Sequence, residues 1–198
     1  MSDKATQTKA LILEKVAPVF NRKGFVATSL SDLTEATGMT KGAIYCHFEN
    51  KEDLAVQAYK VMLKNVLSPL SRLLQAESEA VGKLNALIQY YRDYSKLSKF
   101  YGGCPIINIG VSTQYTNSKL FQLAKNVSKR LEEDLKHIIV EGIEEEYLSQ
   151  ETEPAILAGK IFSMIEGGVF MSMLHHDSRY LSMMMDEAEK VIQANKRK

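Results

Sequence analysis

The chain has 198 residues, of which 45% are hydrophobic and 25% are charged, so its composition is that of a globular protein and excludes a disordered or fibrous one. The net charge is +1, and the first 51 residues carry +2, an asymmetry too small to indicate nucleic-acid binding by itself. Two distant cysteines, Cys46 and Cys104, form neither a disulfide framework nor a metal cluster. No apolar run approaches the roughly 18 residues of a membrane span, and no secretory signal opens the chain. We therefore expect a cytoplasmic protein without a membrane partner, metal or cofactor.

The first predicted helix covers residues 10–20, where the apolar side chains fall on one helix face. Pro18 should bend this helix or weaken its hydrogen bonding locally. Gly24 follows Arg22 and Lys23, which is typical of a helix end with basic residues in its last turn.

Three helix starts then follow one another closely. Each begins with a polar residue suited to capping, and two of these have an aspartate three positions later. The caps are Ser29, Thr40 and Asn50, and the helices that they open are expected at 30–37, 41–48 and 51–67. The turn at residues 38–40 between the first two indicates a helix-turn-helix. The same pattern also suits a compact helical corner with no role in DNA binding.

Beyond Pro69 the apolar spacing predicts longer helices, and no segment has the pattern of a strand. These helices are expected at 81–99, 106–111, 117–146, 154–175 and 179–195. A double glycine and Pro105 separate the first two, and Pro154 suits the first turn of the fourth. The prediction is an all-α protein of about nine helices.

Residues 25–54 carry a resemblance to a known family. They read FVATSLSDLTEATGMTKGAIYCHFENKEDL, which resembles the DNA-binding signature of the TetR family of bacterial transcription regulators. The segment departs from that signature at Thr34, where alanine is usual, and at Cys46, where an aromatic residue is common. The resemblance implies an N-terminal helix-turn-helix domain, residues 1–50. It also implies a C-terminal helical domain, residues 51–198, that binds a small effector and dimerises.

The residue types in the second short helix suit contact with DNA. A recognition helix places its first turn in the major groove, where small residues at 42 and 43 would let the backbone approach the bases. Lys41 can donate to guanine or to a phosphate, and Ala43 can touch a thymine methyl group. Tyr45 and His47 can donate to flanking phosphates, although Tyr45 also suits internal packing and His47 a structural cap. The predicted DNA-contact residues are Ser29, Thr40, Lys41, Gly42, Ala43, Tyr45, His47 and Lys51.

Aromatic and methionine side chains in the C-terminal part suit an adaptable apolar pocket, and each also suits an ordinary core. The predicted effector-binding residues are Met62, Tyr94, Cys104, Asn108, Phe121 and Met164. Tyr94 and Asn108 would supply orienting hydrogen bonds. The resemblance places Cys104 at the edge of the effector cavity, where a sensing thiol and a buried small hydrophobe are the alternatives, the second being favoured. For Cys46 an ordinary small side chain is favoured over a redox role.

The predicted dimer interface is an apolar stripe of the helix at 154–175, supported by the helix at 179–195. Its residues are spaced at three or four positions along one face. They are Leu157, Ile161, Ile165, Val169 and Met173.

The sequence contains no phosphate loop, nucleophile elbow or zinc-protease motif, so we do not expect an enzyme. The resemblance implies a homodimeric regulator, by the habit of the family a repressor, that a small effector releases from double-stranded operator DNA. We expect this effector to be largely apolar. The alternative is a helical dimer that binds a small molecule but has lost DNA affinity, for which the weak basic charge is the support.

Overall fold

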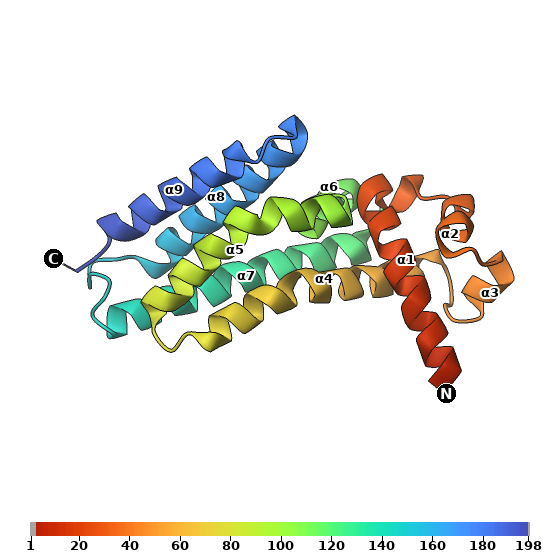
Figure 1. Ribbon diagram of the computed structural model, residues 1–198, viewed down its shortest axis with the longest axis horizontal. Helices are drawn as coiled ribbons and strands as arrows, with labels where there is room; N and C mark the ends of the chain where they lie inside the picture. The colour runs from red at the N-terminus through yellow and green to blue at the C-terminus, as the bar shows by residue number, and fades with distance from the viewer. Residues whose placement is uncertain (1–2, 198) are drawn as a thin grey trace. The chain divides into compact units, whose positions relative to one another are not determined.

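The computed structural model describes residues 3–197, and these are helical apart from connecting segments and one isolated bridge, between Leu148 and Lys196 (Figure 1). The helices of this described range are α1 (Asp3–Ala27), α2 (Leu30–Thr37), α3 (Lys41–Tyr45), α4 (Lys51–Ala76), α5 (Ala80–Tyr101), α6 (Pro105–Thr113), α7 (Ser118–Glu144), α8 (Pro154–His175) and α9 (Arg179–Ala194). The prediction of an all-α fold is confirmed.

The chain packs as two compact units. The first unit extends to Val66 and also contains Ser98–Lys125, and the second contains Leu67–Leu97 and Asn126–Lys198. The first unit thus holds α1, α2, α3 and α6, together with parts of α4, α5 and α7. This division describes packing, so the expected division of function between residues 50 and 51 stays a prediction.

Helix α1 is interrupted at Gly24, where φ is 76° and ψ is 166°. A residue with a side chain rarely adopts this conformation, so the glycine is required by the backbone itself. Packing adds to this, because a Cβ atom at this position would lie 3.1 Å from Cβ of Ser112, a close contact that Ser112 would have to relieve by shifting. Regular α1 therefore ends where the sequence predicts, and a short helical segment, 25–27, follows the break.

Two predicted helix ends are wrong. Helix α3 ends at Tyr45 and not at residue 48, because the amide of His47 bonds to the carbonyl of Ile44 only three residues back, which tightens the last turn. Helix α4 does not end near residue 67 but continues through Pro69 to Ala76. A proline inside a helix costs about 3 kcal/mol, so burial of neighbours such as Leu70 must outweigh it.

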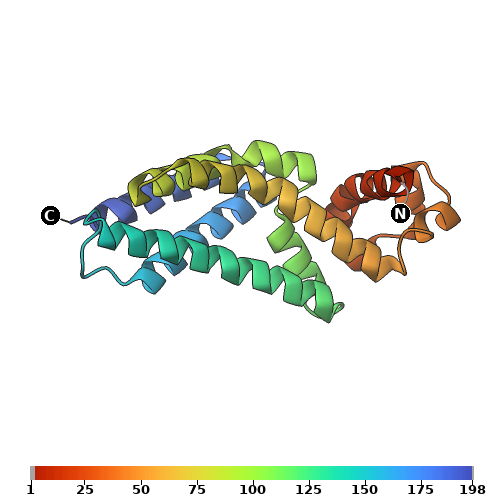
Figure 2. The same cartoon turned by 90° about the horizontal axis from the view of Figure 1, so that it is seen from below.

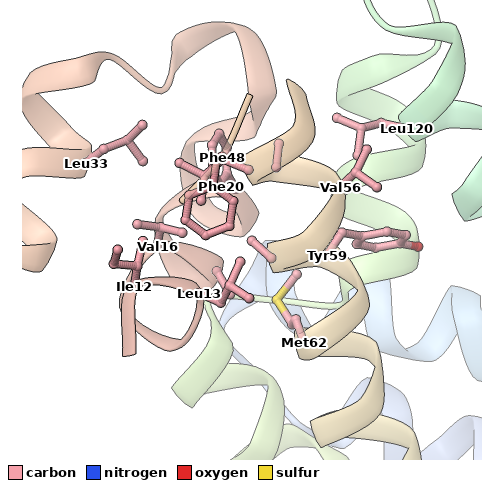
Figure 3. Packing of buried hydrophobic residues seen from close by; sticks show 14 of the residues in the cluster. Ile12, Leu13, Val16, Phe20, Leu33, Phe48, Val56, Tyr59, Met62 and Leu120 are labelled. Carbon is pink, nitrogen blue, oxygen red and sulfur yellow. The ribbon is translucent and has the colours of Figure 1, made fainter. Parts of the chain in front are cut away.

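The core of the first unit joins the N-terminal helices to residues far along the chain (Figure 3). Its members on α6 and α7 are Ile109, Leu120 and Ala124, which share one cluster with buried residues of α1 and α4. Figure 2 shows how α6 leads from the end of α5 to the start of α7. Helices α2 and α3 are too short to be stable alone, and each contributes a fully buried residue to this core, Leu33 and Ile44.

In the second unit, α8 and α9 lie side by side (Figure 1). Gly168 permits this close packing, because a Cβ atom there would lie 3.1 Å from Cα of Leu181 on α9. Arg92 on α5 forms ion pairs with Asp186 and Glu189 on α9, at 2.6 and 3.1 Å. Helix α9 is therefore held against α8 by close packing and against α5 by these ion pairs.

Helix α8 is long and apolar enough to cross a membrane by length and composition alone. The expectation that no apolar run reaches this length is therefore wrong for α8. A core helix of a soluble protein passes the same test, and 44% of the most apolar 18 residues of α8 are buried within the chain. One such helix is weak evidence for a membrane-spanning segment. The buried face of α8 is apolar because it packs against α9.

Candidate nucleic-acid interface

The start of α2 is a complete capping box. The Ser29 hydroxyl accepts from the Asp32 amide at 3.1 Å, and the Ser29 amide donates to Asp32 Oδ2 at 2.8 Å. Lys23 completes the cluster by donating to Asp32 Oδ1 at 2.5 Å. The bond from Lys23, followed by those from Ser29, lowers the pKa of Asp32 to about 2. The predicted cap is confirmed, and the contact of Ser29 with a phosphate stays a prediction.

The first turn of α3 is exposed and carries no acidic residue. Thr40 caps it by accepting from the amide of Ala43 at 3.3 Å, and Lys41, Gly42 and Ala43 are all exposed. A Cβ atom on Gly42 would meet nothing within 4 Å, so this side of the helix faces open space. Because Ile44 is fully buried, it holds the opposite side of α3 against the core. The turn can therefore approach another molecule closely.

The residues after this turn are less accessible. Tyr45 and His47 are both half-buried, and the His47 ring lies edge-on to Phe48 with 6.4 Å between centroids. Cys46 is exposed, and its thiol lies 3.0 Å from the carbonyl oxygen of Ala43 as a donor. Contacts of Tyr45 and His47 with phosphates stay predictions.

The start of α4 is also capped from within the chain. Asn50 Oδ1 accepts from the Asp53 amide at 2.9 Å, as the sequence predicts. Lys51 does not extend freely into solvent: its Nζ lies 4.8 Å from the centre of the Phe25 ring and 3.4 Å from the carbonyl oxygen of Val26. Burial lowers the pKa of Lys51, and the charge of Asp32 opposes this shift. Lys51 therefore links α4 to the end of α1, a role that the sequence did not reveal.

The predicted effector-binding residues fall on both units. Met62, Cys104, Asn108 and Phe121 belong to the first unit, and Tyr94 and Met164 belong to the second. Met62, Tyr94 and Cys104 are buried, whereas the other three are half-buried. The side-chain amide of Asn108 already donates to two backbone carbonyls of its own chain, so its remaining polar atom is Oδ1. One cavity lined by all six residues stays a prediction.

The predicted dimer stripe is not on the surface. Four of its five residues are buried in their own chain and only Met173 is half-buried. The buried four are Leu157, Ile161, Ile165 and Val169. Their face of α8 packs within the second unit, so they are unavailable to a partner in this conformation. The exposed apolar residues of the α8 and α9 pair are instead Ile156, Phe170, Leu174 and Met183.

Known proteins match both parts of the chain. A family model described as "Bacterial regulatory proteins, tetR family" matches residues 12–58, and one described as "Tetracyclin repressor-like, C-terminal domain" matches residues 80–188. The crystal structure of a TetR family transcriptional regulator from Cytophaga hutchinsonii is 30% identical and has a TM-score of 0.90, covering 100% of this chain and 99% of that chain.

Two named regulators are also similar in sequence. The HTH-type transcriptional regulator TtgR from Pseudomonas putida is 39% identical over 77 residues, which cover 39% of this chain and only 36% of TtgR. The uncharacterised HTH-type transcriptional regulator YxaF from Bacillus subtilis is 26% identical over 178 residues, covering 89% of this chain and 90% of YxaF. With a matching helix-turn-helix, a matching C-terminal domain and a full-length structural relative, the chain belongs to the TetR family: it is a DNA-binding transcriptional regulator and not an enzyme.

Proposed function

We propose that this regulator is a homodimeric repressor that reads its operator through the first turn of α3 and is released by a small effector. The observation that carries the DNA contact is the exposed turn Lys41, Gly42 and Ala43, which has no acidic residue and is held from behind by Ile44. In the major groove this turn would contact base edges. Phosphates would be contacted by Thr40, Tyr45, His47 and Lys51, and by Ser29 at the N-terminus of α2.

Dimerisation is proposed to use the outer face of the α8 and α9 pair. Phe170 and Leu174 are 46% and 60% exposed, on a helix whose opposite face is buried in its own chain. Ser163 and Gly167 lie between Ile156 and Phe170 on this face, and such small residues let a second helix approach. In such a dimer the partner would cover the exposed apolar face of α8, so both faces of this hydrophobic helix would be shielded from water. We expect this dimer to act in the cytoplasm, where its operator is.

The effector is proposed to bind within residues 51–198 and to be small and largely apolar. The predicted wall consists of aromatic, methionine and cysteine side chains with one asparagine, and it lacks the clustered basic residues that would hold phosphate or several carboxylates. Binding would favour a conformation with lower operator affinity. Because such a coupling is reciprocal, operator DNA must weaken effector binding by the same factor.

The proposal is tested first by selecting duplexes from a random pool with the full-length protein, then by measuring their affinity against unrelated competitor DNA. Specific binding, about 1,000-fold or more tighter than binding to the competitor, is expected. If no duplex is enriched, the rival function is supported, namely a helical dimer that binds a small molecule without binding DNA. Compounds that raise the melting temperature of the free protein are then tested for release of the selected duplex.

A further inference from the structure

Two asparagine side chains tie α1 to the segment that leads from α5 into α6. The Asn21 amide donates to the carbonyl oxygens of Tyr101 and Gly103, both at 2.9 Å. The Asn108 amide, on α6, donates to the carbonyl oxygens of Asn21 and Gly102, both at 3.0 Å. Each asparagine thus uses both of its N–H groups, and Asn108 bonds to the backbone of Asn21 itself. We call this arrangement the amide clasp.

The clasp holds carbonyl groups at a helix end. Tyr101 is the last residue of α5, and Gly102 and Gly103 follow it with φ of 77° and 120°. Carbonyls in such a position have no partner within their own helix, and buried ones cost free energy unless a donor satisfies them. Asn21 is only 2% exposed, so its bonds are shielded from water. Bonds of this kind are costly to break without a replacement.

Close packing on both sides of the clasp leaves little freedom for sliding. A Cβ atom on Gly102 would lie 2.0 Å from Cγ of Arg22, the neighbour of Asn21 on α1. One turn further along α1, Gly24 lies against Ser112 near the end of α6. All of these residues belong to the first unit, so the contacts lie within one compact body.

We propose that the amide clasp makes α6 follow α1, and that Asn108 is a positioning residue that transmits occupancy of the DNA interface to α6. Helix α1 is joined to α2 by the ion pair between Lys23 and Asp32, and it shares one core with α2 and α3, so fixing these helices on DNA also fixes the clasp. Helix α6 belongs to the region expected to bind the effector. The inference therefore deepens the proposed function and rests on it for its DNA-dependent part.

The test compares hydrogen exchange of the full-length wild type with that of Asn108→Leu, which keeps the size of the side chain and removes both donors. Asn117→Leu is the matched control. Asn117 is also a half-buried asparagine of the first unit, and its amide nitrogen donates to Glu52 on α4 at 3.3 Å. Its Oδ1 accepts from the Leu120 amide at 2.9 Å, so Asn117→Leu loses bonds to α4 and α7 but none to α1. Asn108→Ser, a smaller change, replaces Asn108→Leu if that variant does not fold.

In the free protein, Asn108→Leu is expected to speed exchange in α1 around residues 20–27 as well as in α6, whereas Asn117→Leu leaves α1 unchanged. This arm needs no DNA. If α1 exchanges at the wild-type rate in the Asn108 variants, the clasp does not join the two helices and the inference is overturned.

The second arm adds a duplex selected with the wild-type protein. In the wild type and in Asn117→Leu, DNA is expected to slow exchange of α6 by roughly 5- to 150-fold beyond any slowing in α9, which reports global stabilisation alone. In Asn108→Leu the extra slowing in α6 should be lost while that in α2 and α3 persists. Equal slowing of α6 in all variants would overturn the transmission role. Failure to select any duplex would overturn the proposed DNA binding and this transmission with it, while the free-protein arm would still decide the clasp.

Discussion

Lys23 and Asp32 form an ion pair, with 2.5 Å between Nζ and Oδ1, that joins the last part of α1 to the start of α2. The same carboxylate accepts from the amide and hydroxyl groups of Ser29. One aspartate therefore caps a helix and ties it to its neighbour. The ion pair requires the ionised carboxylate, and the bonds from Ser29 are stronger to the ionised form than to the protonated one.

This cluster gives the first prediction, a dependence of stability on acid. The pKa of Asp32 in the folded protein is about 2, below the ordinary value of 3.8. Its contribution is therefore complete above about pH 5 and is lost as the pH falls through 4 towards 2. Asp32→Asn should lower the free energy of unfolding near pH 6. Urea denaturation at a series of pH values should show the gap between variant and wild type closing towards pH 2, and a gap of constant size would contradict the assignment.

The second prediction separates stability from DNA binding at Gly42. This glycine is helical and faces open space, so Gly42→Ala should stabilise the protein by about 0.5–1 kcal/mol. The added methyl group should nevertheless weaken operator binding, because it occupies the side of α3 that approaches the bases. Gly110→Ala on α6, where the new Cβ would make an ordinary 3.8 Å contact, is the control for helix propensity. Tighter DNA binding by Gly42→Ala would contradict the assignment of α3 as the helix that enters the major groove.

The third prediction contrasts two lysines. Lys41→Ala should weaken DNA binding without changing the melting temperature, because its side chain is exposed at the start of α3. Lys51→Ala should weaken DNA binding and also lower stability, by about 0.5–1 kcal/mol, since it loses the contact with the Phe25 ring. Each lost phosphate contact should reduce the slope of log affinity against log salt by about one unit. Both variants are compared with the wild type by measuring DNA affinity over a series of salt concentrations and by thermal unfolding.

The fourth prediction distinguishes the two faces of α8. Phe170→Glu, on the exposed face, should produce folded monomers in sedimentation, because a charge replaces an apolar contact between protomers. Ile165→Ala, on the buried face, should keep the dimer but lower the free energy of unfolding by about 2–5 kcal/mol. If Ile165→Ala gave folded monomers and Phe170→Glu remained a dimer, the stripe that contains Ile165 would be the interface. The exposed face that contains Phe170 would then be excluded.

The sequence by itself determined the features that depend on near neighbours in the chain. The caps Ser29, Thr40 and Asn50 each bond to an amide three residues later, so their residue types were enough to place α2, α3 and α4 at their first residues. The break at Gly24 was readable for the same reason, because it arises from the backbone freedom of one residue. The family signature lies within this locally determined segment.

Only the tertiary structure decided which face of α8 is buried. Apolar residues occur all around that helix, so their spacing fitted Leu157 and Ile161 as well as Ile156 and Phe170. Packing within the second unit decides between the two faces. The face with Leu157 and Ile161 is buried against the chain's own helices, so it cannot contact a partner. The amide clasp was hidden for a related reason: Asn21 and Asn108 are 87 positions apart, and neither asparagine has a local pattern that names its partner. Hydrogen bonds between distant segments depend on how the helices pack, and that packing exists only in the folded chain.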